Sequence, residues 1–126
     1  VLAFDERQPE RGGAGRLAGC RAHGLVLVVQ QHAGVGDSGF EADNLEENND
    51  ATPRSAPTIY NVTLIGTQDA AASQRAMVLR RGTRAIIKNA IITGFPTEAI
   101  DVRDTATVAG TKDGSLTVEH TMFFSI

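Results

Sequence analysis

The sequence predicts an all-β fold in which short parallel strands stack into a solenoid, a parallel β-helix. Three observations support this. Similar segments recur about every 25 to 30 residues, which is a typical repeat length for solenoids. Within each segment, apolar residues alternate with others, as a strand with one buried face requires. No window shows the apolar stripe of an amphipathic helix. We expect about four to five coils from this spacing.

The composition suits a narrow aliphatic core. Of the 126 residues, 41% are hydrophobic but only 5% are aromatic, and tryptophan is absent. Val, Ile, Leu and Ala must therefore fill most of the interior, as the stacked coils of a β-helix require. The alternative is a β-sandwich, but a sandwich favours shorter spacing between strands and clearer hairpin turns.

The first set of predicted strands shares one sequence pattern. Asn61 and Gly66 recur as Asn89 and Gly94 at an offset of 28 (89 − 61), and a further 31 residues (120 − 89) lead to His120. The four segments are 25–30, 59–67, 87–95 and 118–125, of which the first is the least similar. Stacked asparagines at one corner would hydrogen-bond to each other, so we expect Asn61 and Asn89 to be neighbours.

A second set of strands lies between the members of the first. Its segments are 39–43, 76–80 and 99–103. If the coils align, Asp43, Arg80 and Arg103 occupy one equivalent position. The alternate position is then held by Glu41, Val78 and Asp101. This alignment predicts neighbouring charges on one outward face.

The chain divides into two regions by composition. Residues 1–24 contain four Arg and five Gly and show no periodicity, so we expect an irregular or partly disordered leader. Residues 25–126 form the predicted β-helix domain.

Charge and cysteine content exclude several classes of protein. Twelve Lys and Arg against fifteen Asp and Glu give a net charge of −3, which disfavours a nucleic-acid-binding module. The single cysteine excludes an intrachain disulfide and a cysteine-based zinc cluster. The longest apolar run, Leu25–Val29, is far shorter than the ~20 residues of a membrane span.

An acidic stretch between residues 37 and 50 is the strongest candidate for a metal site. It contains no base, and its acids are Asp37, Glu41, Asp43, Glu46, Glu47 and Asp50. Calcium accepts six to eight oxygen ligands in flexible geometry, so this stretch predicts a calcium site. The alternative is an acidic turn exposed to solvent.

Several motifs resemble bacterial secreted or lipoprotein-type right-handed parallel β-helix proteins of the pectate-lyase-like superfamily. They are Asp37-Ser-Gly-Phe-Glu-Ala-Asp-Asn, Asn48-Asn-Asp-Ala-Thr-Pro-Arg-Ser, Pro57-Thr-Ile-Tyr-Asn-Val-Thr-Leu-Ile-Gly-Thr, Leu79-Arg-Arg-Gly-Thr, Ile92-Thr-Gly-Phe and Ala99-Ile-Asp. The resemblance covers roughly residues 25–126. It implies a right-handed solenoid that is the C-terminal portion of a longer one. It also implies a secreted, periplasmic or cell-envelope location.

The same resemblance suggests catalytic residues. In pectate-lyase-like enzymes, carboxylates hold calcium and an arginine acts as the base. This chain offers Asp43 and Asp101 as carboxylates, and Arg80 or Arg103 as the base. It lacks the Trp-x-Asp-His signature of that family, having no tryptophan. The alternative is that these residues form ion pairs along the ladder, which protect the sheet from edge-to-edge association.

These observations predict a calcium-linked, secreted or cell-envelope β-helix protein with a binding or structural role, whose flat face engages a glycan or another protein. The first alternative is a calcium-dependent hydrolase or lyase that acts on esters, lactones or polysaccharides. The second is a non-functional fragment of a larger solenoid. The chain ends in the apolar run Met122-Phe-Phe-Ser-Ile, so we also expect either self-association into a homo-oligomer through the C-terminal coil or a continuation of the solenoid beyond this run.

Overall fold

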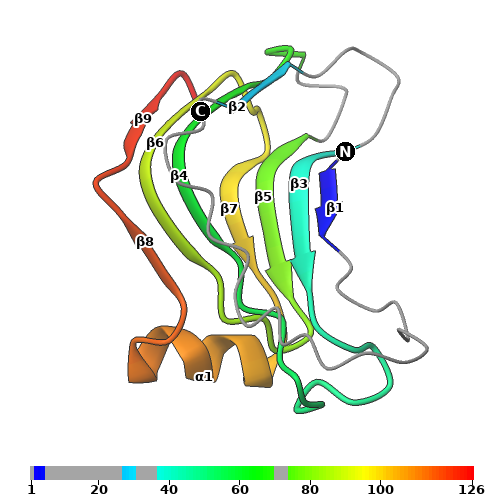
Figure 1. Ribbon diagram of the computed structural model, residues 1–126. Coiled ribbons are helices and arrows are strands. Elements are labelled where there is room, and N and C mark those ends of the chain that lie inside the picture. The colour runs from blue at the N-terminus through cyan, green and yellow to red at the C-terminus, as the bar shows by residue number, and fades with distance from the viewer. Residues whose placement is uncertain (1, 5–26, 31–36, 70–73) are drawn as a thin grey trace, which may run out of the picture.

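The computed structural model describes residues 2–4, 27–30, 37–69 and 74–126, which form two parallel sheets and one helix (Figure 1). Sheet A has the strand order β1-β3-β5-β7, and sheet B has the order β2-β4-β6-β8, with β9 also beside β6. Sheet A comprises β1 (Leu2–Phe4), β3 (Ser38–Asp43), β5 (Arg75–Arg80) and β7 (Glu98–Val102). Sheet B comprises β2 (Leu27–Gln30), β4 (Thr58–Ile65), β6 (Ile86–Thr93), β8 (Thr117–Glu119) and β9 (Met122–Phe124).

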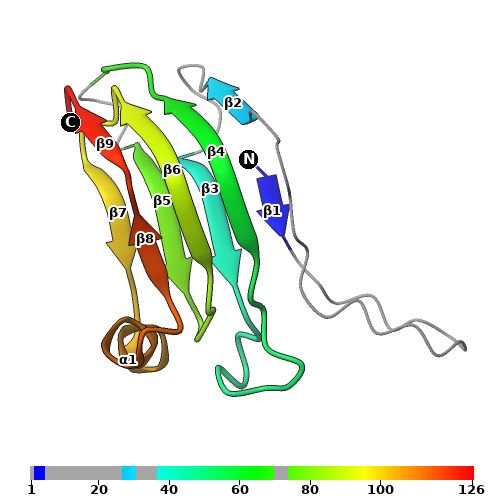
Figure 2. The ribbon, with the colours of Figure 1, turned by 60° about the vertical axis from the view of Figure 1, so that its left-hand side comes forward.

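Consecutive strands from β1 to β7 alternate between the two sheets, so each strand pairs with the one two places along the chain. All seven pairings are parallel. Figure 2 shows the two sheets as layers facing each other. The regular secondary structure of the described residues is therefore mostly strand in parallel sheets, as the repeats predict.

The strand register confirms the sequence alignment of the first set. Tyr60 pairs with Lys88 and Val62 with Ala90, which places Asn61 beside Asn89 at the predicted offset. Asn89 donates from Nδ2 to Oδ1 of Asn61. Both asparagines adopt left-handed backbone conformations, with φ of 58° and 57°, and His120 in the next coil has φ of 52°. Asparagine tolerates this conformation better than most residues, which explains why it recurs at the bend.

The core lies between the inner faces of the two sheets. Ile59, Val62 and Leu64 of β4 are buried, and Ile87, Ala90 and Ile92 of β6 stack beside them. The aliphatic interior is confirmed, but the largest fully buried side chains are Phe40 and Phe95, together with Met77 and several aliphatics.

Phe95 occupies space that two glycines leave open. A Cβ on Gly39 would lie 3.3 Å from Phe95 Cζ, and one on Gly66 would lie 3.0 Å from Phe95 Cγ. On Gly66 it would also overlap the carbonyl group of Gly94 in the neighbouring coil. The recurrence of glycine at 66 and 94 thus reflects close approach of backbones.

Helix α1 (Thr105–Asp113) corrects the all-β prediction. It begins after Asp104, whose side chain accepts a hydrogen bond from the Thr107 amide, and it ends at Gly114 in the left-handed conformation. Only Thr107 and Gly110 of the helix are buried, so it has no apolar stripe for a periodicity search to find. The helix lies across the end of the strands where β7 leaves sheet A (Figure 1).

Two sequence predictions fall partly outside the described residues. At the start of the predicted leader, Leu2–Phe4 form β1, which pairs with β3. Residues 5–24 lie outside the described part. Of the segment 25–30, residues 27–30 form β2 and pair with β4, as a fourth copy of the repeat should. In the described ranges, no helix has the length and apolarity that crossing a membrane requires.

Candidate functional site

The outward face of sheet A carries a row of charged side chains, here called the charged ladder. It consists of Glu41, Asp43, Arg75, Arg80, Arg81, Glu98, Asp101 and Arg103. On β3, strand alternation points Phe40 and Ala42 into the core and Glu41 and Asp43 away from it. The register places Asp43 beside Arg80 and Val78 beside Asp101, as the sequence alignment predicts.

Arginines and carboxylates pair closely at the β3–β5 end of the charged ladder. Arg80 Nε lies 2.9 Å from Asp43 Oδ1, and Arg80 Nη2 lies 2.9 Å from Glu41 Oε2. Arg81 Nη1 lies 2.8 Å from the other oxygen of Asp43, and its Nη2 lies 2.9 Å from Glu46 Oε2. Asp43 is therefore held between two guanidinium groups.

The β5–β7 end repeats this pattern. Arg103 Nη2 lies 2.7 Å from Asp101 Oδ2, and Arg75 Nε lies 3.1 Å from the same oxygen. Arg75 Nε also lies 3.2 Å from Glu98 Oε2. The four predicted catalytic residues Asp43, Arg80, Asp101 and Arg103 thus lie on one face, but all four are ion-paired. This geometry agrees with the alternative interpretation, in which these residues form ion pairs along the ladder.

The electrostatics of the charged ladder do not favour an arginine base. A hydrogen bond to Asp43 raises the pKa of Arg80 above its ordinary value, although partial burial opposes this. The pKa of Arg103 is raised in the same way by its hydrogen bond to Asp101. A general base must be unprotonated before it accepts a proton from the substrate, and a raised pKa makes the unprotonated form of both arginines scarcer. A catalytic role for these residues stays a prediction.

The six predicted calcium ligands fall into several separate environments. Glu41, Asp43 and Glu46 face Arg80 and Arg81 in or beside the charged ladder. The other three are Asp37, which accepts a hydrogen bond from Ser38 Oγ, Glu47, which is exposed, and Asp50, which lies 2.7 Å from Arg54 Nη2. Among the described residues, no group of three or more His, Cys, Asp or Glu has an arrangement that could hold a metal ion. The calcium site stays a prediction.

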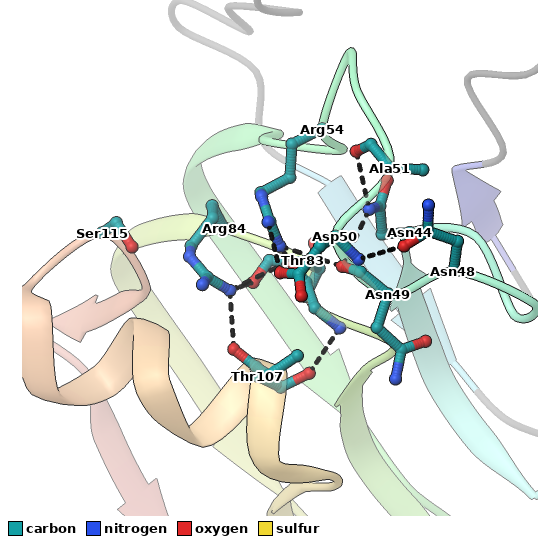
Figure 3. A network of polar contacts seen from close by, with 12 residues as sticks. Asn44, Asn48, Asn49, Asp50, Ala51, Arg54, Thr83, Arg84, Thr107 and Ser115 are labelled. Atoms are coloured by element: carbon teal, nitrogen blue, oxygen red, sulfur yellow. Dashed lines mark hydrogen bonds and ion pairs between the residues drawn. The ribbon is translucent and has the colours of Figure 1, made fainter.

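The side chain of Asn44 closes the loop that follows β3, here called loop 44–55 (Figure 3). Asn44 Nδ2 donates to the carbonyl oxygens of Asn49 and Ala51, both at 3.1 Å. The Oδ1 atom of Asn44 accepts from the Ser55 amide at 3.2 Å. Asn44 is buried, so these bonds satisfy a polar group that would otherwise be costly.

Loop 44–55 is fastened to the next coil at Gly82. The Gly82 carbonyl accepts from Arg54 Nη1 at 2.7 Å and from Arg84 Nη1 at 2.9 Å. The Gly82 amide donates to Thr107 Oγ1 of α1 at 2.8 Å. Arg84 Nη1 also donates to the Ala106 carbonyl of α1 at 2.9 Å. These contacts join loop 44–55, the turn between β5 and β6, and helix α1 (Figure 3).

Sequence reasoning gave Arg54 no part in these networks. Arg81 follows β5 in a left-handed conformation with φ of 56°, and this turns its side chain back toward Asp43. Its neighbour Gly82 has φ of 81°. The Arg-Arg-Gly run was a usable signal for a tight turn at this point.

Sheet B carries a smaller charged pair on its outer face. Lys88 Nζ lies 3.0 Å from Glu119 Oε2, and the two residues are in register on β6 and β8. Their hydrogen bond lowers the pKa of Glu119 and raises that of Lys88. Tyr60 occupies the same row one strand earlier.

Comparison with known families agrees with this architecture. The family described as pectate-lyase-like beta helix domain matches residues 22–126. No curated protein and no solved structure matches the chain. The matched region contains sheet B, the strands of sheet A after β1, helix α1 and the whole charged ladder. The chain therefore belongs to the family of pectate-lyase-like β-helix domains.

Proposed function

We propose that the chain is a binding or structural β-helix domain that acts outside the cytoplasm, secreted or at the cell envelope, and contacts an extended glycan through the charged ladder. The solenoid in this proposal is right-handed and has four to five coils. The observation that carries the proposal is the alternation of arginine and carboxylate groups across β3, β5 and β7.

Physical chemistry supports a polymeric ligand for this face. Parallel strands repeat about every 4.8 Å, so donors and acceptors of the charged ladder recur at a regular spacing along the stacking direction. A polysaccharide also presents hydroxyl groups at a regular spacing. Guanidinium and carboxylate groups are planar and can each make two parallel hydrogen bonds. Arg103 and Glu98, whose side chains are 41% and 48% exposed, are the most accessible of these groups.

Binding fits the charged ladder better than catalysis. A lyase requires a base that is unprotonated at the working pH, whereas the hydrogen bonds from Arg80 and Arg103 to aspartates raise the pKa of both. A calcium ion bound through Asp43 and Glu46 would have to displace Arg81, which pairs with both. The test of this proposal therefore compares binding in the presence and in the absence of calcium.

Glycan binding is measured by isothermal titration calorimetry with soluble polysaccharides, one anionic and one neutral, with added calcium and with a chelator. The test variant carries Asp101→Asn and Arg103→Gln, which replace both charged groups with neutral amides and remove their ion pair. The matched control carries Lys88→Gln and Glu119→Gln, which remove an exposed ion pair from sheet B.

We expect the sheet A variant to lose at least tenfold in affinity and the sheet B control to bind as the unmodified chain does. Equal losses in both variants, or no binding to either polymer, would refute the proposal. Release of unsaturated or reducing ends that stops on adding chelator would replace it with the hydrolase or lyase alternative.

A further inference from the structure

The side chain of Arg84 is held in place by main-chain oxygens beside helix α1. Its Nη1 atom donates to the carbonyls of Gly82, Thr83 and Ala106, at 2.9, 3.1 and 2.9 Å. The helix approaches the guanidinium closely, because a Cβ on Gly110 would lie 3.0 Å from the Cδ, Nε and Nη1 atoms of Arg84. The guanidinium is therefore fixed between the turn after β5 and helix α1 (Figure 3).

Another edge of this guanidinium is open. All three hydrogen bonds of Arg84 use Nη1, and among the described residues Nε and Nη2 have no partner. Neither atom is among the buried side-chain atoms that lack a partner, which are Asn49 Oδ1 and Ser55 Oγ, so both are open to solvent. The two N–H groups form a planar fork of the kind that binds the two oxygens of a carboxylate.

The charge of Arg84 is not neutralised within the described residues. Its partners are carbonyl oxygens, which carry no net charge, and it forms no ion pair with a described carboxylate. Arg54 lies beside it, because Nη1 of each arginine donates to the same Gly82 oxygen, at 2.7 and 2.9 Å (Figure 3). Arg54 also pairs with Asp50 at 2.7 Å. The two guanidinium groups and this carboxylate leave one positive charge uncompensated, which favours an anion at this place.

Asp113, the acidic residue of helix α1, does not neutralise Arg84. Its Oδ1 atom accepts hydrogen bonds from the amide and from the hydroxyl of Ser115. These hydrogen bonds lower the pKa of Asp113, and the charges of Arg84 and Arg54 contribute in the same direction to a smaller extent. Asp113 thus lies in the positive field of both arginines but is bonded to Ser115 rather than to Arg84.

We propose that the Nε–Nη2 edge of Arg84 binds the carboxylate of a small organic acid. A carboxylate accepts two parallel hydrogen bonds from this fork, and its single negative charge matches the one uncompensated positive charge. Because three carbonyls already hold the guanidinium, binding requires little further ordering of that side chain. The residues that hold Arg84 are not part of the charged ladder, so the inference is independent of the proposed function.

Nuclear magnetic resonance of the full chain tests the proposal with sodium acetate as the probe, at about pH 6 where acetate is ionised. Sodium chloride keeps the ionic strength constant. The Nε–H signal of Arg84 is assigned by its loss in Arg84→Lys, and the backbone amide of Gly110 is a second reporter that this variant retains. Lysine keeps the charge of residue 84 but lacks the planar fork. Acetamide is the uncharged comparison, and sulfate is the divalent one.

Two substitutions in loop 44–55 form a matched pair. Asp50→Asn removes the partner of Arg54, whereas Glu47→Gln removes an exposed acid that forms no ion pair among the described residues. Both substitutions change the net charge equally. Asp50→Asn alone leaves Arg54 uncompensated beside Arg84, so this substitution should strengthen acetate binding more than Glu47→Gln does.

We expect acetate to shift the Nε–H signal of Arg84 along a saturable curve and acetamide to leave it unchanged. The affinity for acetate should fall about tenfold in Arg84→Lys. It should rise about threefold in Asp50→Asn and stay within about twofold in Glu47→Gln. The double variant Asp101→Asn, Arg103→Gln should bind acetate as the unmodified chain does.

Four results would overturn the proposal: a shift no larger than that caused by chloride, unchanged affinity in Arg84→Lys, equal effects of Asp50→Asn and Glu47→Gln, or tighter binding of sulfate than of acetate. Circular dichroism confirms that each variant is folded. If Arg84→Lys does not fold, the comparison of Asp50→Asn with Glu47→Gln decides, because neither substitution touches the bonds that hold Arg84.

Discussion

Replacing Asn89 with alanine tests whether the asparagine stack holds adjacent coils in register. Asn89 has φ of 57° and donates a side-chain hydrogen bond to Asn61 in the neighbouring coil. Alanine removes the hydrogen bond and also places a residue without a polar side chain in the left-handed region. Glycine removes the hydrogen bond but adopts this backbone conformation without strain.

The two substitutions differ in their expected effects on the free energy of unfolding. A non-glycine residue in the left-handed region costs about 1 kcal/mol when no side chain helps to stabilise it. The hydrogen bond is exposed, so it contributes at the low end of the usual range, about 0.5 kcal/mol. We therefore expect Asn89→Ala to destabilise the fold by about 1.5 kcal/mol and Asn89→Gly by about 0.5 kcal/mol. The alanine variant should melt about 5 °C lower.

Urea unfolding followed by circular dichroism gives these free energies, provided that one two-state transition describes each variant. A double-mutant cycle with Asn61→Ala then isolates the side-chain contact, and we expect a coupling energy of about 0.5 kcal/mol. Equal stability of the alanine and glycine variants would refute the strain argument. A coupling of zero between Asn61 and Asn89 would refute the stacking argument.

Three further predictions concern the turn, the core and the ion pair on sheet B. Gly82→Ala should destabilise the fold by at least about 3 kcal/mol in urea unfolding, because a Cβ would overlap the carbonyl of Asn49 at positive φ; a loss below about 1 kcal/mol would contradict this. Leu64→Ala should lower the unfolding free energy by about 2 to 5 kcal/mol, since Leu64 is fully buried; a near-neutral result would contradict the core assignment. Glu119 has a pKa below its ordinary value of 4.5, so its contribution to stability is present above that pH and is lost as the pH falls through the lower folded pKa. Urea midpoints between pH 6 and pH 3 should therefore decline less steeply in Lys88→Met, and identical slopes would refute this.

The strand alignment could be predicted because the backbone geometry of each coil restricts which residues can occupy certain positions. A left-handed bend in each coil selects asparagine, and close approach of backbones selects glycine, so Asn61 and Gly66 recur in the next coil. Once these positions are aligned, the pairing of Asp43 with Arg80 follows from the register of β3 and β5. This part of the charged ladder was therefore accessible without a structure.

Helix α1 and loop 44–55 were not predictable from the same signals. The helix buries only Thr107 and Gly110, so its stability depends on capping and on hydrogen bonds from Arg84 rather than on an apolar stripe. Asn44 illustrates the difficulty in the loop. An amide side chain that could ligate a metal can equally bind backbone groups, and only the path of the chain decides between these roles.

The contacts at Gly82 have a consequence for how the domain comes apart. Stacked repeats are ordinarily stabilised by neighbour-to-neighbour terms, so outer units can detach one at a time. Here Arg54 from the preceding turn and Thr107 from the following helix both form hydrogen bonds with Gly82. If the last coil, with α1, detaches, the turn at Gly82 loses its hydrogen bond to Thr107. The opening of the last coil is therefore coupled to the opening of the coil before it. We therefore expect amide hydrogen exchange in these turns to follow one shared opening event instead of gradual fraying.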